Sequence, residues 1–151
     1  AKFEFPADAP LGIHSLRVVT RGGISNPRLF CIDSVPTIEE NNDNKALSKA
    51  QSVTIPCAIA GKIAAETSHF YKFSVKAGQR INIETIARRL GGPLDPIIRL
   101  YDAKTSRELN VPYSDDEPGL QSDARINHTF TEAADVTVEI RDSRHEGGAE
   151  S

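Results

Sequence analysis

The sequence has no methionine and no tryptophan, and it has only two cysteines among its 151 residues. Because even position 1 is not methionine, we expect the chain to be an excised or processed piece of a longer polypeptide. Two thiols, Cys31 and Cys57, are too few for a disulfide-dense scaffold, and they form no C-x-x-C pair of the kind that favours a zinc site. Whether they form one bridge or stay apart as small apolar side chains is open, because the sequence does not fix their distance.

Strong charge of one sign and long apolar runs are also missing. The net charge is −3, with 38% apolar and 26% charged residues, which is typical of a soluble globular protein and disfavours nucleic acid or an anionic membrane as partner. No apolar run approaches the ~20 residues that span a bilayer. The N-terminal residues AKFEFPADAPLG lack the basic start and apolar core of a signal peptide. We therefore predict a soluble chain without a membrane span.

Local signatures of catalysis are missing as well. The sequence has no H-E-x-x-H zinc motif, no G-x-S-x-G elbow and no P-loop lysine. Its four histidines are widely spaced: His14, His69, His128 and His145. We predict that His145 lies in an exposed turn. We predict that the chain is not an enzyme and has no catalytic or cofactor-binding residues, although a triad assembled from distant residues stays open. With six Phe and three Tyr, the stacking platform of most sugar-binding modules is poorly supplied.

What the sequence does contain, from Val53 onward, is a series of alternating segments. Tyr71, Phe73 and Val75 recur with a period of two, and the same period recurs in DVTVEIRD near the end of the chain. Short turns such as AGQ and TEAA separate these segments at roughly ten-residue spacing. The pattern predicts an all-β fold, an antiparallel β-sandwich of jelly-roll-like character.

Two further strands are predicted before this region. Residues 13–20 and 28–33 are apolar and are joined by the turn RGGISNP, which predicts an N-terminal β-hairpin. Two strands are too few to be stable alone. A polar connector over residues 36–52, with one helical turn expected at residues 46–50, separates the hairpin from the sandwich.

One loop is strongly acidic. Residues 114–123 hold four acids and no base, namely Asp115, Asp116, Glu117 and Asp123, and Asp95 and Asp102 are expected on a neighbouring strand. Ca²⁺ takes six to eight oxygen ligands, which carboxylates and loop carbonyls supply, although the spacing is not that of an EF-hand. The alternative is structural: Asp115 and Asp123 accept backbone N–H groups and cap turns, while the other acids remain in water.

The region from about Glu39 to Gly148 resembles the bacterial pre-peptidase C-terminal domain, an extracellular β-sandwich module. The resemblance covers about two thirds of the chain and rests on the ordered motifs EENN, HFYKFSVKAGQRI, LDPIIRLYD, SDD with SDAR, and VTVEIRD. The preceding SNPRLFCIDSVP is similar to the last strand of an immunoglobulin-like domain of the IPT/TIG type. We therefore expect residues 1–35 to be the C-terminal strands of such a domain, 36–52 a linker and 53–151 the sandwich.

The resemblance implies a secreted or cell-surface location and a non-catalytic accessory module of a larger hydrolase or surface protein, which binds a protein or matrix partner beside its neighbouring domains. It also implies calcium at the linker, with Glu39, Asn41 and Asn42 as candidate ligands. Together with Asp115, Asp116 and Asp123 of the acidic loop, these are the predicted calcium ligands. Two departures stand out. Thr67 and His69 occupy the positions of the family's D-x-D pair, and the chain ends soon after the Gly147–Gly148 pair, where the family continues into one more strand.

Two alternatives stay open beside this prediction. The chain could be a calcium-stiffened spacer that only sets the distance between domains, or a fragment of a secreted peptidase whose catalytic residues lie outside it.

Overall fold

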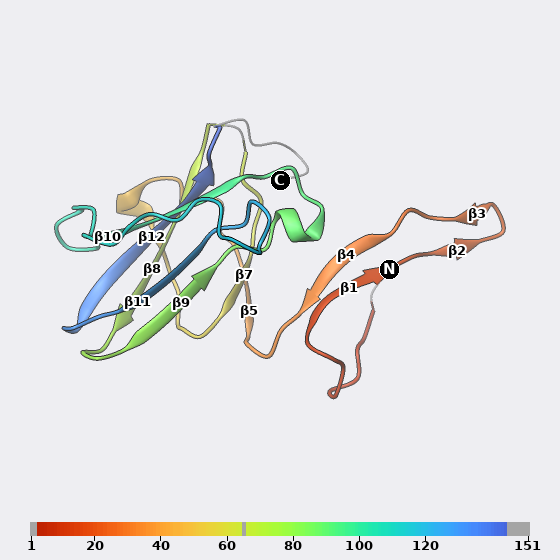
Figure 1. Cartoon of the computed structure of the whole chain (residues 1–151), viewed down its shortest axis with the longest axis horizontal. Helices are drawn as coiled ribbons and strands as arrows, with labels where there is room; N and C mark the ends of the chain where they lie inside the picture. The colour runs from red at the N-terminus through yellow and green to blue at the C-terminus, as the bar shows by residue number, and fades with distance from the viewer. Residues whose placement is uncertain (1–2, 65, 145–151) are drawn as a thin grey trace.

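The largest sheet of the protein is built around β8, Ser68–Val75, in which apolar and polar residues alternate. The computed structural model describes residues 3–64 and 66–144. In it, four strands pair in the order β10–β12–β8–β6, with β6 at Gln51–Ser52, β10 at Pro96–Asp102 and β12 at Ala134–Asp142. Only the short β6 runs parallel to its neighbour (Figure 1).

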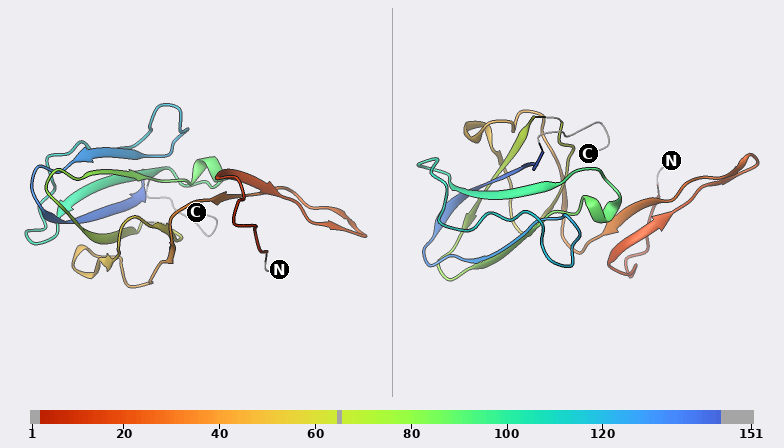
Figure 2. Two further views of the ribbon diagram at one scale, coloured as in Figure 1. Left: turned by 90° about the horizontal axis from the view of Figure 1, so that it is seen from below. Right: turned by 45° about the horizontal axis from the view of Figure 1, so that its top comes forward.

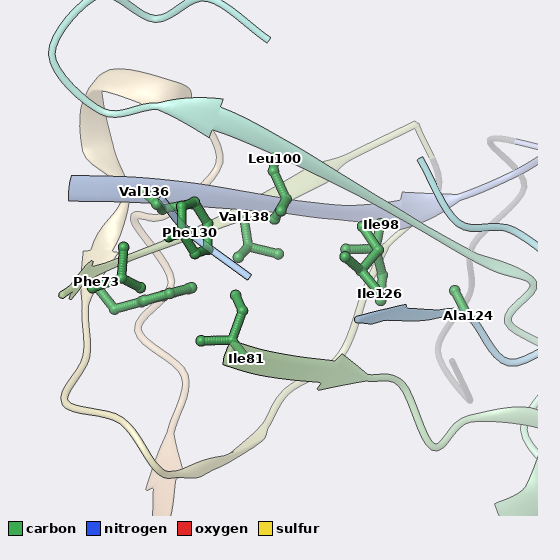
Figure 3. Close-up of a cluster of buried hydrophobic side chains, with 10 residues drawn as sticks. Phe73, Ile81, Ile98, Leu100, Ala124, Ile126, Phe130, Val136 and Val138 are labelled. Atoms are coloured by element: carbon green, nitrogen blue, oxygen red, sulfur yellow. The ribbon is translucent and has the colours of Figure 1, made fainter. Parts of the chain in front are cut away.

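A second layer faces this sheet. It consists of β9, Arg80–Glu84, and β11, Arg125–Thr129, paired antiparallel. The inward side chains of both layers meet in one apolar core (Figure 3), whose members are Phe73, Val75, Ile81, Ile98, Leu100, Ala124, Ile126, Phe130, Val136 and Val138. The all-β, sandwich-like fold predicted from the period of two is therefore confirmed.

The segment predicted as a linker carries structure of its own. β5, Thr37–Glu39, pairs in parallel with β7, Ala58–Ala60, and the expected helical turn is the 3₁₀ turn η1, Leu47–Lys49. The alternating segments were expected to begin at Val53, but within residues 53–63 only β7 is a strand. Pro56 explains part of this difference, because proline has no N–H to donate to a ladder.

The predicted N-terminal hairpin is a long two-stranded ribbon. β1, Gly12–Leu16, pairs with β4, Arg28–Ile32, and towards the tip β2, Val19–Thr20, pairs with β3, Gly23–Ile24. Figures 1 and 2 show it projecting away from the sandwich, with its base beside the 3₁₀ turn η2, Arg88–Leu90. Residues 12–32 are called the ribbon below. Among the described residues, no third strand pairs with it.

Within the described ranges, no helix has the length and apolar character needed to cross a membrane. The exposed turn predicted at His145 and the end of the sandwich predicted at the Gly147–Gly148 pair lie outside the described residues.

Candidate functional site

The acidic loop between β10 and β11 brings three carboxylates together. Ser114 exchanges two backbone hydrogen bonds with Ile98 of β10, at 2.9 and 3.1 Å, and these hold the start of the loop against the sheet. Asp115 and Asp116 therefore lie next to Asp95, which directly precedes β10. One carboxylate oxygen from each of the three lies within 4.8 Å of the others. We call these three residues the acid cluster.

The charges in the acid cluster are poorly compensated. Oδ1 of Asp95 and Oδ1 of Asp115 are both buried and have no hydrogen-bond partner. Burial raises the pKa of Asp115, and repulsion from Asp116 and Asp95 raises it further. The repulsion is offset in part, because Asp95 Oδ2 accepts a hydrogen bond from Ser143 Oγ at 2.6 Å and lies 3.7 Å from Nε of Arg144. The positive charge of Arg141 also acts to lower the pKa of Asp115. A cation bound here would relieve this repulsion and give the two buried oxygens a partner.

Asp123, predicted as a fourth ligand, lies elsewhere and has a structural role. Its side chain is fully buried, and Oδ1 accepts the backbone N–H groups of Ala87 and Arg88 at 2.8 and 2.9 Å. Oδ2 accepts Nε of Arg89 at 2.7 Å. Asp123 thus caps the η2 turn and pairs with its arginine, as the structural alternative for this residue proposed.

The three predicted linker ligands do not join the acid cluster either. Glu39 is exposed at the end of β5, and Asn42 is exposed in the turn that follows. Asn41 is occupied locally, because its Oδ1 accepts the backbone N–H of Asp43 at 3.2 Å. In the part of the chain that the structure describes, the acid cluster is the group of three that could hold a metal ion.

The most elaborate polar cluster is centred on a residue that the sequence did not single out, Glu40. Its Oε1 accepts hydrogen bonds from Tyr71 Oη at 2.6 Å, from Asn44 Nδ2 at 2.9 Å and from His69 Nδ1. Its Oε2 accepts the backbone N–H of Lys62 at 3.1 Å. The cluster joins the linker to β8, so His69 does meet the linker, but through Glu40.

The hydrogen bonds to Glu40 favour its ionised form, and Gly61 leaves space for its carboxylate. Burial opposes ionisation, but the hydrogen bonds from Tyr71, Asn44 and His69 outweigh it and lower the pKa of Glu40. Burial and the same carboxylate raise the pKa of Tyr71. Gly61 completes the cradle, since a Cβ at that position would lie 2.5 Å from Glu40 Oε2. The sequence signal was weak: one glutamate in a polar run, with His69 and Tyr71 two residues apart on one strand face.

Two other groups of polar side chains are also occupied by structural contacts. Glu84 of β9 pairs with Arg89 of the η2 turn and with Arg125 of β11, each at 2.6 Å. Glu139, buried on β12, accepts hydrogen bonds from Ser68 Oγ and Tyr101 Oη at 2.6 and 2.7 Å. These carboxylates therefore cross-link strands of the sandwich.

The hollows and thiols offer little for chemistry. Two open hollows lie on the surface of the described residues: one is lined by the turn at residues 74–79, and the other lies beside the acid cluster. Neither is lined by a histidine or a cysteine. Cys31 and Cys57 are unbridged and half-buried, and burial raises the pKa of Cys57, which disfavours its reactive thiolate form.

The chain matches no protein-family model, and no curated protein matches it.

Proposed function

We propose that the protein is a non-catalytic accessory module of a larger secreted hydrolase or cell-surface protein, and that it binds a protein or matrix partner. The observation that carries the proposal is the projecting ribbon, which exposes apolar side chains that the sandwich does not cover. Val19 and Ile24, direct cross-strand partners near the tip, are 74% and 65% exposed.

The distribution of exposed apolar residues supports this role. Of the large apolar side chains exposed among the described residues, all but Tyr113 lie within the first 29 positions. Scattered apolar residues are ordinary on a protein surface, but a contiguous group on one projecting element marks a site of interaction. The apolar residues of the sandwich, in contrast, are gathered in its core.

The test is binding by the purified chain to immobilised matrix proteins, with collagen, gelatin and fibronectin as probes. The proposal expects saturable binding to at least one probe, which the double substitution Val19→Lys with Ile24→Lys abolishes. Tyr113→Ser, at an exposed aromatic residue outside the ribbon, is the matched control and should leave binding unchanged. Hydrolytic turnover by the purified chain that disappears when one serine or histidine is changed would contradict a non-catalytic role.

A second candidate is a calcium-stiffened spacer, and the acid cluster is the observation that favours it. Two of its carboxylate oxygens are buried without a partner, which is costly unless a cation or another donor satisfies them. A cation that binds the folded state alone raises the melting temperature by mass action.

Scanning calorimetry separates this candidate from the structural alternative. With bound calcium, the melting temperature should rise when calcium is added and fall back with chelator, and Asp116→Asn should remove most of the rise. Glu132→Gln removes one exposed negative charge outside the acid cluster and should preserve it. A calcium response that is the same in both variants, or absent from the unmodified chain, would leave the acidic loop as a solvated turn.

A further inference from the structure

The linker is attached to the sandwich through one carboxylate that protein donors surround. The side chains of Glu40 and His69 are only 9% and 2% exposed. Glu40 accepts hydrogen bonds from the side chains of Tyr71, Asn44 and His69 and from the backbone N–H of Lys62. A carboxylate offers about four acceptor sites, and four donors occupy this one. We call these five residues the Glu40 cluster.

This set of donors does not suit a calcium ion. Calcium takes six to eight oxygen ligands, whereas the side chains around Glu40 present hydrogen atoms to it. Oδ1 of Asn44 is buried without a partner, but Nδ2 of the same amide donates to Glu40 at 2.9 Å, so Oδ1 is not directed at that carboxylate. The ring of His69 lies where the resemblance described above predicts an acid.

The ligands predicted for calcium at the linker do not supply a site either. Glu39 and Asn42 are exposed, and Oδ1 of Asn41 accepts the backbone N–H of Asp43. In the described part of the chain, the group of side chains close enough to hold a metal ion is the acid cluster, which includes no linker residue. The residues present therefore do not fit a calcium ion at the linker.

Backbone hydrogen bonds on both sides of the carboxylate complete the attachment. The N–H of Glu40 donates to the carbonyl of Ala60 at 3.1 Å, and the N–H of Phe70 donates to the carbonyl of Asn44 at 2.8 Å. The linker is thus bonded to β7 and to β8 by groups of the chain itself.

We propose that the linker is attached to the sandwich independently of calcium, because His69 makes the contact to Glu40 that a bound cation would otherwise make. This departs from what the resemblance implies for the linker. It also separates the linker from the acid cluster, at which a calcium response is the second candidate function.

The test is amide hydrogen exchange of the full chain, followed by NMR. The amides of Glu40, Lys62 and Phe70 report on the attachment, since each donates one of the hydrogen bonds that form it. Asp116→Asn is present throughout, so that an ion at the acid cluster does not contribute. Exchange at the three amides should be the same in excess chelator and in about 10 mM calcium, a concentration above the dissociation constants of extracellular calcium modules.

Two substitutions of equal size test the role of the histidine donor. His69→Asn keeps an N–H group near the position of Nδ1, whereas His69→Asp replaces it with a second carboxylate beside Glu40. In chelator, and relative to the amides of β12, the three amides should exchange at least about tenfold faster in His69→Asp than in His69→Asn, because a hydrogen bond to a charged group is lost and repulsion is added.

Slower exchange at these amides when calcium is added to the chain that keeps His69, or equal exchange in the two His69 variants, would overturn the inference. Neither result depends on the matrix probes, so the proposed function is tested separately.

Discussion

Removing the Glu40 carboxylate should destabilise the protein more than any other single change in its linker. Glu40→Ala leaves four donors without their acceptor, and three of them belong to residues that are at most 7% exposed, namely Asn44, His69 and Tyr71. Each unsatisfied buried donor costs about 1–3 kcal/mol. Because these donors share one acceptor and relax together, we expect a total loss of about 3–5 kcal/mol, as for breaking a buried charged pair.

The assay is chemical denaturation, with the free energy of unfolding obtained by linear extrapolation. In a thermal scan the same loss corresponds to a fall in melting temperature of roughly 10 °C. Glu39→Ala is the matched control, because Glu39 is adjacent and exposed, and its substitution should change stability by no more than about 0.5 kcal/mol. If the two variants are equally stable, the Glu40 cluster is not the anchor of the linker.

Three further predictions concern the same structural clusters. The difference in unfolding free energy between the unmodified chain and Glu40→Gln should shrink in acid. A carboxyl whose pKa is lowered by folding stabilises the protein above its ordinary pKa, and this stabilisation is lost as the pH falls through the pKa of the folded state. Equal differences at neutral and acid pH would refute this. Gly61→Ala should cost about 1–3 kcal/mol by denaturation, since the new Cβ would collide with the Glu40 carboxylate, whereas Gly22→Ala, which meets only a side-chain oxygen at 3.7 Å, should be nearly neutral. Asp123→Ala should cost about 3–5 kcal/mol, because it removes the buried acceptor of Arg89 Nε and of the backbone N–H groups of residues 87–89, and a loss as small as that for Glu132→Ala would contradict the capping role.

The sequence predicted the fold because apolar residues recur with a period of two in the strands of the sandwich. In β8 and β12 the residues that this period placed inward, such as Phe73 and Val138, form the core, while Thr137 on the other face of β12 is buried as well. The ribbon was also predicted, since its apolar strands flank a glycine-rich turn. What covers the ribbon could not be predicted, because an apolar strand pattern does not distinguish among the surfaces that it can pack against.

The polar sites were predictable only in part. Asp115 and Asp116 are adjacent in sequence, so any fold keeps them together, and Asp95 joins them only through the pairing of Ser114 with Ile98. Asp123 is in the same acidic loop, yet the path of the chain buries it beneath η2. The sequence therefore shows which carboxylates are close along the chain, but it does not show which of them lie together in the fold.

The Glu40 cluster illustrates the same limit more strongly. Glu40 and the donor side chains of His69 and Tyr71 are about thirty positions apart, and only the packing of the linker on β8 brings them together. Thr67 and His69 occupy the positions at which the resemblance predicts a pair of acids. A histidine donor and a glutamate acceptor satisfy the contact instead, with the charge on the linker side.

We propose that the protein acts through its ribbon, while the polar clusters of the sandwich serve its structure. Hydrogen–deuterium exchange of the full chain, with and without a saturating amount of the matrix probe that it binds, distinguishes these two roles. Slower exchange at residues 12–32 when the probe is added, with the amides of β8 and β12 unchanged, is the predicted result. Exchange in the ribbon that the probe leaves unchanged, or protection that develops in the sandwich instead, would contradict it.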